Sequence, residues 1–104
     1  MRIASTTTAF PSSLALPPTA PVGLVATAGV QQAALSWTAA ASATSYNVKR
    51  AMTSGGPYTI VANVTTTNHT DNGLTNGTNY FYVVSALNPA GESANSAPVS
   101  VTLQ

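Results

Sequence analysis

The sequence predicts an all-β fold, an antiparallel sandwich built from about seven short strands. In several short segments apolar residues alternate with polar ones, and this period of two is typical of half-buried strands. Turn dipeptides such as Asn72-Gly73 and Asn76-Gly77 separate the segments. Because no segment has a convincing apolar period of 3.6 residues, no helix is expected.

Two strands are predicted in the first half of the sandwich. The first covers Gly23–Thr27 and the second covers Gln32–Thr38. Alternate residues of a strand point to the same face, so Ala33, Leu35 and Trp37 share one face of the second strand. This face is expected to pack into the core.

A turn separates the next two predicted strands. The third strand is Ser45–Arg50, with Tyr46 and Val48 pointing inward. The turn is Ser54–Pro57, because glycine supplies unusual φ angles and proline fixes one. The fourth strand, Tyr58–Val64, follows directly.

Three later strands complete the sandwich. Asn68–Asp71 is predicted as a short fifth strand, and Asn79–Leu87 as the longest strand. The last strand lies within Glu92–Leu103, mainly over Val99–Leu103. The sandwich domain is therefore expected over residues 22–104, a length that one hydrophobic core can stabilise.

The segment Met1–Pro21 differs from the rest in composition. It is rich in Thr, Ser and Ala and is interrupted by prolines, which predicts an extended arm or linker. Apolar residues spaced along an extended segment suit strand addition to the sheet edge of a neighbouring protein. The arm residues that we expect to contact a partner are Ile3, Phe10, Leu14 and Leu16.

Charged residues are scarce, at 5% of the chain, and the net charge is +1. Such a chain cannot build the basic face that nucleic-acid binding requires. There is no Cys, which rules out a disulfide framework and a Cys-based zinc site. Met1–Phe10 is too polar to predict a signal peptide, and no apolar run is long enough to predict a membrane span.

Residues from about Pro18 to Leu103 resemble a fibronectin type III domain. The matching features occur in the family's order: the opening segment Pro18–Leu24, the core aromatics Trp37 and Tyr46, the corner pair Leu74 and Tyr80, and then Asn88, Gly91 and Ser93. The resemblance implies a seven-stranded immunoglobulin-like β-sandwich. It assigns the fold-defining roles to Trp37, Tyr46, Leu74 and Tyr80, with the Tyr80 hydroxyl bonded to a nearby backbone group.

No arrangement of residues predicts catalysis. Asp71 and Glu92 are the only acidic side chains, and they read as a turn residue and a loop residue. His69 and Asp71 would share a face of one short strand, but no strained nucleophile turn accompanies them. One His and two separated acids do not make a metal site, so we expect no catalytic residue, cofactor or metal.

Surface contacts are expected from side chains that the core does not use. Phe81 and Val83 point away from the face that carries Tyr80 and Tyr82, which makes them candidate partner contacts. Aromatic rings left outside the core are also platforms for sugar rings, and Phe10, Tyr58 and Phe81 are the candidates for a weak contact with polysaccharide.

Local phrases narrow the resemblance to bacterial and phage modules. Ser54–Tyr58, Asp71–Leu74 and Tyr82–Asn88 are similar to modules of secreted polysaccharide-degrading enzymes, and similar modules occur in phage structural proteins. One hypothesis is a non-catalytic display or decoration protein on a phage particle or extracellular filament. It would dock through its arm on a protein partner, and a second copy of the same chain is one such partner. The alternative is a spacer or adhesion module of a secreted enzyme.

Overall fold

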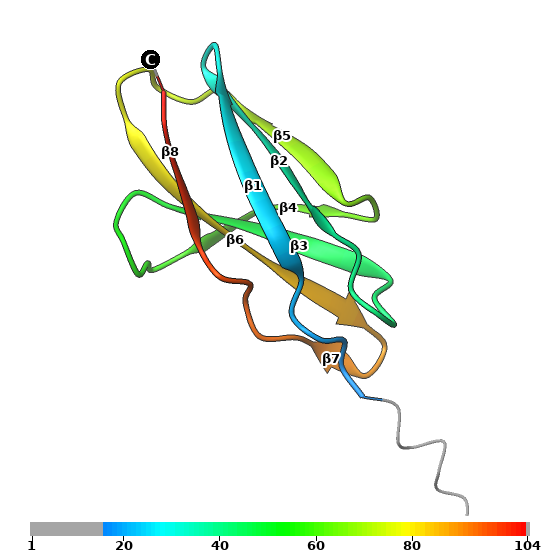
Figure 1. The fold of residues 1–104 in the computed structure, drawn as a ribbon. Coiled ribbons are helices and arrows are strands. Elements are labelled where there is room, and N and C mark those ends of the chain that lie inside the picture. Colours follow the sequence, from blue (N-terminus) through cyan, green and yellow to red (C-terminus); the bar gives the residue numbers. More distant parts are fainter. Residues whose placement is uncertain (1–15, 104) are drawn as a thin grey trace, which may run out of the picture.

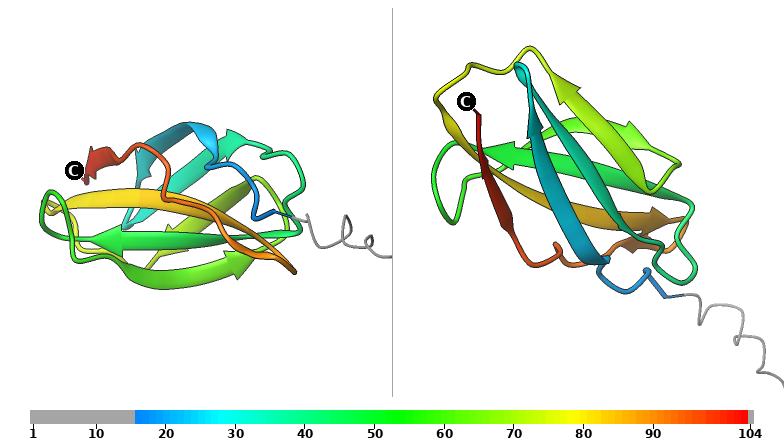
Figure 2. Two further views of the ribbon diagram at one scale, coloured as in Figure 1. Left: turned by 90° about the horizontal axis from the view of Figure 1, so that it is seen from below. Right: turned by 45° about the horizontal axis from the view of Figure 1, so that its top comes forward.

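Two antiparallel sheets packed face to face form the structure, a computed structural model that describes residues 16–103 (Figure 1, Figure 2). Its strands in chain order are β1 (Val22–Gly29), β2 (Gln32–Thr38), β3 (Ser45–Ala51), β4 (Thr59–Val64), β5 (Asn68–Asn72), β6 (Asn79–Asn88), β7 (Gly91–Glu92) and β8 (Val99–Thr102). The predicted all-β sandwich is confirmed. The structure has eight strands rather than seven, because two residues after the β6 turn form the short strand β7.

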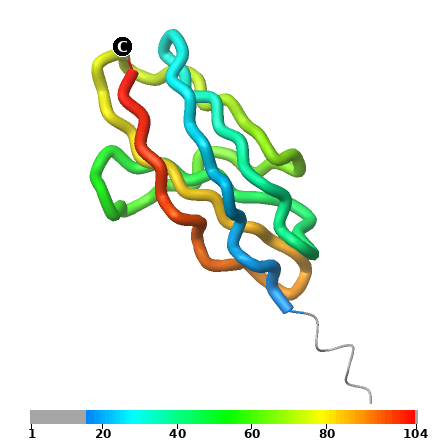
Figure 3. Tube along the Cα trace, in the orientation of Figure 1, coloured from blue at the N-terminus to red at the C-terminus, as the bar shows by residue number. Residues whose placement is uncertain are grey.

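The strands divide between two sheets of different size. One sheet has the order β1-β2-β5, and the other has the order β4-β3-β6-β7, with β8 also paired to β6. In the long β3–β6 ladder Arg50 lies opposite Tyr82. Strands β1 and β8 belong to different sheets but run side by side along one edge of the sandwich (Figure 3).

The core fills the space between the sheets and contains the inward residues that alternation predicts. Its fully or nearly buried members are Ala33, Leu35, Trp37, Tyr46, Val48, Leu74, Tyr80, Tyr82, Val84, Ala86, Val101 and Leu103. Full burial of one large apolar side chain stabilises a fold by roughly 1.5–3 kcal/mol relative to its exposure. These contacts hold the two sheets together.

The four residues expected to define the fold are all buried. The rings of Trp37 and Tyr46 meet edge to face across the core, with their centroids 5.5 Å apart. The Thr75 amide donates a hydrogen bond to the Tyr80 hydroxyl oxygen at 3.0 Å, which is the backbone bond that the resemblance implies. This bond lowers the pKa of Tyr80.

The segment between β7 and β8 accompanies β6 without forming a regular strand. The Ser93 and Ser96 amides donate to the carbonyls of Ala86 and Val84, both at 2.8 Å. In return, the Ser93 and Ser96 hydroxyls accept hydrogen bonds from the Ala86 and Val84 amides, at 2.9 and 3.0 Å. Serine side chains here replace backbone acceptors, so β6 stays paired although its neighbour is irregular.

The described chain enters and leaves at opposite ends of the sandwich (Figure 1). At the end where it enters, the Asn88 side-chain amide donates to the Leu16 carbonyl at 2.8 Å and to the Ser42 carbonyl at 3.3 Å. At the other end, the Gly77 amide donates to the Leu103 carbonyl at 2.7 Å. Both ends are therefore tied to turns of the sandwich.

Candidate docking surface

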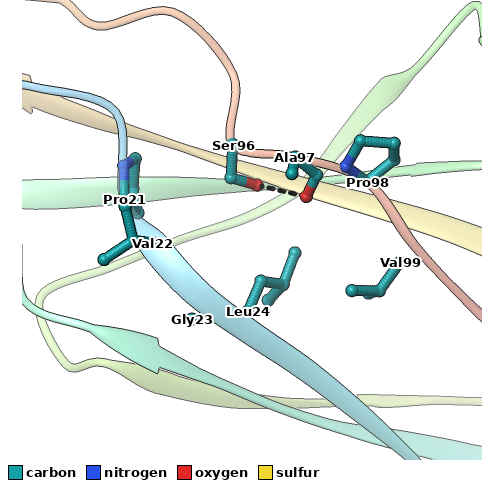
Figure 4. Close-up of a pocket in the computed structure, with 8 residues that line it drawn as sticks. All are labelled: Pro21, Val22, Gly23, Leu24, Ser96, Ala97, Pro98 and Val99. Atoms are coloured by element: carbon teal, nitrogen blue, oxygen red, sulfur yellow. Dashed lines mark hydrogen bonds between the residues drawn. The ribbon is translucent and has the colours of Figure 1, made fainter.

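Two hollows adjoin at the start of β8, one on the side of β1 and the other on the side of β6 and the β3–β4 turn, and we call them together the edge groove. The larger, of about 220 Å³, is lined by Pro21, Val22, Gly23, Leu24, Ser96, Ala97, Pro98 and Val99 (Figure 4). The smaller, of about 150 Å³, is lined by Ser54, Gly55, Tyr58, Phe81, Pro98, Val99 and Ser100. Pro98 and Val99 line both hollows, so the two hollows adjoin at these residues.

The floor of the larger hollow is apolar. Figure 4 shows the side chains of Leu24 and Val99 between β1 and β8, with Pro98 beside them. The one polar side chain drawn there is that of Ser96, whose hydroxyl donates a hydrogen bond to the Ala97 carbonyl at 3.1 Å. At the outer side Val22 is exposed. The hollow therefore offers apolar contact rather than hydrogen bonding.

The β3–β4 turn and β6 place the two aromatic rings of the smaller hollow. The turn needs glycine because Gly55 and Gly56 have φ angles of 84° and 93°. A Cβ added at Gly56 would lie 3.0 Å from the Tyr58 ring, so the absence of a side chain there leaves room for this ring. Phe81 lies on β6 opposite Ser100 of β8. Both rings are only half-buried.

The sequence-predicted contact residues do not lie together: some line the edge groove, one is exposed at the entry of the chain, and others lie outside the described residues. Phe81 lines the edge groove as a partly exposed side chain. Tyr58, predicted separately as a sugar platform, lies in the same hollow. Leu16 is 71% exposed where the chain enters the sandwich. Ile3, Phe10 and Leu14 lie outside the described residues.

The prediction that Val83 is a surface contact is wrong. Its side chain is only 2% exposed, although it points away from the core. The physical reason is Lys49, which lies opposite Val83 on β3 and reaches beyond β6 to Glu92. The lysine side chain and the segment after β7 therefore cover this outer face of β6.

All acidic side chains and all lysine and arginine side chains of the described chain are engaged in two ion pairs. Lys49 contacts Glu92 at 3.0 Å and donates a hydrogen bond to Asn95 at 2.7 Å. Glu92 also accepts hydrogen bonds from Ser85 and Asn47. The hydrogen bond from Ser85, and then the one from Lys49, lowers the pKa of Glu92. No charged residue lines the edge groove.

Asp71 is not the turn residue that the sequence suggested. It is buried, and its Oδ2 accepts hydrogen bonds from Arg50 and from the Tyr82 hydroxyl, both at 2.7 Å. Burial, and then the contact with Asp71, strongly raises the pKa of Tyr82. The signal in the sequence was that Asp71 is the single acid of β5, but only the β3–β6 register shows which residues it meets.

These contacts leave no free acid–base pair in the part of the chain that the structure describes. His69 and Asp71 do lie on one face of β5, but the Asp71 carboxylate is bound by Arg50 and Tyr82. Among residues 16–103 there is no group of three His, Cys, Asp or Glu side chains that could hold a metal ion. Nor does this range contain a helix that is long and apolar enough to cross a membrane.

Comparison with known proteins places this geometry in a family. The family model of the fibronectin type III domain matches residues 17–102. Among solved structures, a Fn3-like protein from Clostridium thermocellum is 47% identical, with a TM-score of 0.79 over 84% of this chain and 94% of that one. These matches span the whole sandwich.

Relatives with curated names include enzymes and one phage protein. The chain is 47% identical over 85 residues to a poly(3-hydroxybutyrate) depolymerase of Ralstonia pickettii and 40% identical over 78 residues to an amylopullulanase of Thermoanaerobacterium saccharolyticum. These matches cover 80% and 74% of this chain but only 16% and 6% of the enzymes. The chain is similar to a small part of each enzyme.

The phage relative matches a longer part of this chain. It is the tail tube protein gp17.1* of Bacillus phage SPP1, 40% identical over 98 residues, which are 94% of this chain and 35% of that protein. A match of that length does not fit within residues 17–102. It therefore extends into the arm that precedes the sandwich.

Proposed function

The chain belongs to the fibronectin type III family, and from this premise we propose that it is a non-catalytic display domain, docked on a larger assembly through its N-terminal arm. The assembly would be a phage particle or an extracellular filament. In this proposal the arm residues Ile3, Phe10 and Leu14 contact the assembly, and the sandwich stands outside it.

The match to a phage protein over arm and sandwich together is the observation that carries this proposal, and the geometry of the two ends agrees with it. Asn88 fixes Leu16 at one end of the sandwich, while the chain leaves at the other end. An arm that precedes Leu16 thus joins the sandwich at a defined point and at one pole. This arrangement suits a domain that is held at one end and displays the rest of its surface. Similarity to a tail tube protein over arm and sandwich together supports the same proposal.

Similarity to secreted polymer-degrading enzymes favours a second candidate function. An exoglucanase B of Cellulomonas fimi is 44% identical over 92 residues, which are 8% of that enzyme. In this alternative the sandwich is a spacer or adhesion module between other domains of a secreted enzyme, and ends at opposite poles suit that position equally well. The arm is then an interdomain linker without a docking role.

Purification from the native source separates the two candidates. For the display domain we expect a chain of about the mass of this sequence, 10.5 kDa, that sediments with a much larger particle. For the enzyme module we expect its peptides within a much longer chain that does not sediment with particles. Detection of the small chain free of any particle would contradict the display proposal.

Substitution in the arm then tests the mode of docking. We expect Phe10→Ser combined with Leu14→Ser to release the protein from the particle, because an arm whose single charge is Arg2 depends mainly on apolar contact for docking. The matched control is Thr6→Ser combined with Thr8→Ser, which changes the same arm without removing large apolar side chains. Equal occupancy of the particle by both variants would contradict docking through the arm.

A further inference from the structure

We propose that the edge groove receives the N-terminal arm of a second copy of this chain, so that copies join head to tail. The inference rests on the proposed function, because it names the partner on which the arm docks. It is carried by the juxtaposition, in one short chain, of a groove that no charged residue lines and an arm segment, Phe10–Leu16, that has three large apolar side chains and no charge.

The size of the groove identifies the kind of group that it holds. Its hollows measure about 220 and 150 Å³, whereas sites for small-molecule ligands usually measure about 300–1,000 Å³. Hollows of this size suit individual side chains. Another hollow of about 380 Å³ lies beside the β3–β4 connection, but Arg50 and Met52 line it and no aromatic residue does.

The chemistry of the groove selects an apolar peptide that contains proline. Tyr58, Phe81, Pro21 and Pro98 are among its lining residues. Grooves lined by aromatic residues commonly bind extended proline-containing segments, which lose little conformational entropy on binding. Because no charged residue lines either hollow, a charged ligand would find no counter-ion there.

The sequence of the arm matches this groove. In an extended chain, residues at even spacing point to one face, so Phe10 and Leu14 would present two apolar side chains together. Within Phe10–Leu16 the only proline is Pro11, so the backbone amides of the even-numbered residues of this segment remain available along one edge. The segment Phe10–Leu16 carries no charge.

The point where the arm joins the sandwich favours a second copy over the same chain. Asn88 holds the Leu16 carbonyl, and Pro17 and Pro18 follow. Pro21 and Val22, which come next along the chain, already line the larger hollow. To reach the groove of its own sandwich, the arm would have to reverse at Leu16 and run back past these stiff prolines. An arm on one pole and a groove on the β1–β8 edge make a heterologous contact, which builds rings or filaments.

Sedimentation of the full chain tests the proposal with two variants that should complement each other. The arm variant is Phe10→Ser with Leu14→Ser, and the groove variant is Phe81→Ser. We expect each to associate roughly ten- to a hundredfold more weakly than the natural chain, as expected for the loss of one large apolar contact. Mixed together, they should form a one-to-one dimer that grows no further, because one intact arm meets one intact groove.

Further variants guard the test against misfolding and against a general loss of apolar surface. Tyr58→Ser probes the groove a second time, and Trp37 fluorescence checks that each variant folds. Ile60→Ser is the matched control, since Ile60 is an exposed apolar residue on β4 outside the groove. It should associate like the natural chain.

Four outcomes would overturn the inference. One is a natural chain that stays monomeric, and another is a mixture of arm and groove variants that does not dimerise. The third is groove variants that associate normally. The fourth is a groove whose NMR signals respond to a soluble glucan and not to the arm. If groove variants still dock on the native particle while arm variants do not, the proposed function stands and this inference fails.

Discussion

Trp37 and Tyr46 bring the two sheets into contact through single side chains. Trp37 lies on β2 of the three-stranded sheet and Tyr46 on β3 of the other, and their rings meet at an interplanar angle of 64°. The Tyr46 hydroxyl accepts a hydrogen bond from the Ala40 amide at 3.0 Å. The Trp37 indole nitrogen is buried without a hydrogen-bond partner among the described residues. The contribution of Trp37 is therefore packing.

Substitutions at Trp37 should separate packing from hydrogen bonding. We expect Trp37→Ala to lower the free energy of unfolding by about 3–5 kcal/mol, because it leaves a large cavity. Trp37→Phe should cost clearly less, since it keeps an aromatic ring and removes a donor that has no partner. Urea unfolding followed by circular dichroism measures both. Equal losses for the two variants would show that the indole nitrogen does matter.

Asp71 should matter to stability although it sits in a short strand. Asp71→Asn weakens its contacts with Arg50 and Tyr82, and we expect a loss of roughly 1–3 kcal/mol in the free energy of unfolding. Tyr82→Phe removes one of these hydrogen bonds and leaves the ion pair, so its effect should be smaller. A double-mutant cycle checks this, and strictly additive losses would contradict the contact.

Glu92 should make stability fall at acid pH. Its pKa is lowered in the folded state, so it stabilises the fold above its unfolded value, near 4.5, and this contribution is lost as pH falls through the folded pKa. Because its side chain is 39% exposed, solvent screens the effect to less than about 1 kcal/mol. We expect Glu92→Gln to flatten the dependence of thermal stability on pH below that value. An unchanged slope would contradict this role.

At the scale of elements, the connection between β7 and β8 shows how an irregular segment can close a sheet. Ser96 is buried, and its hydroxyl is the acceptor for the Val84 amide. Ser93 does the same for the Ala86 amide. Two serine hydroxyls therefore accept hydrogen bonds from the backbone amides of β6, where a neighbouring strand would have used its carbonyls.

Ser96→Ala should be unusually costly for the loss of one hydroxyl. It leaves the Val84 amide buried without an acceptor, and we expect a loss of roughly 1–3 kcal/mol in the free energy of unfolding. Ser36→Ala, at an exposed position of β2, is the matched control and should change stability by less than about 0.5 kcal/mol. Chemical denaturation compares the two. Hydrogen exchange at Val84 should accelerate only in the Ser96 variant.

Elements whose signal is local were predictable from the sequence. The bounds of β2 agree with the prediction because Ala33, Leu35 and Trp37 mark its inward face within one segment. The burial of Val83 was not predictable, since it depends on a lysine from one strand reaching an acid near another. The edge groove likewise needs Tyr58 and Phe81 to meet, and nothing in either segment alone indicates the other. The sequence pattern does not predict which side chains of distant segments come into contact.

At the scale of the whole molecule, the scarcity of charge is the dominant property. The lysine, arginine and acidic side chains of the described chain neutralise one another in two pairs, and the rest of the described surface carries uncharged polar side chains and some exposed apolar ones. Long-range electrostatic attraction therefore has little to act on. We therefore expect a partner of the described surface to be recognised by shape and apolar contact.

Association of the protein should accordingly be nearly independent of salt. We expect the affinity of the arm for its partner to change by less than about threefold between low and high ionic strength, because the charged side chains of the sandwich are already paired with one another. Sedimentation in a series of sodium chloride concentrations measures this. A steep fall in affinity with salt would instead indicate that Arg2, the one charge of the arm, binds an acidic partner.

The placement of the two ends also determines how the domain would bear tension. The chain enters at the start of β1 and leaves after β8, at opposite poles (Figure 1). A pull on the ends would drag β1 along β2 and β8 along β6, so the hydrogen bonds of each ladder would be sheared together rather than broken one by one. A domain anchored to a particle or cell surface and pulled by hydrodynamic drag would therefore stay folded until the hydrogen bonds of a whole ladder break. The unfolding rate sets how long the domain withstands the pull.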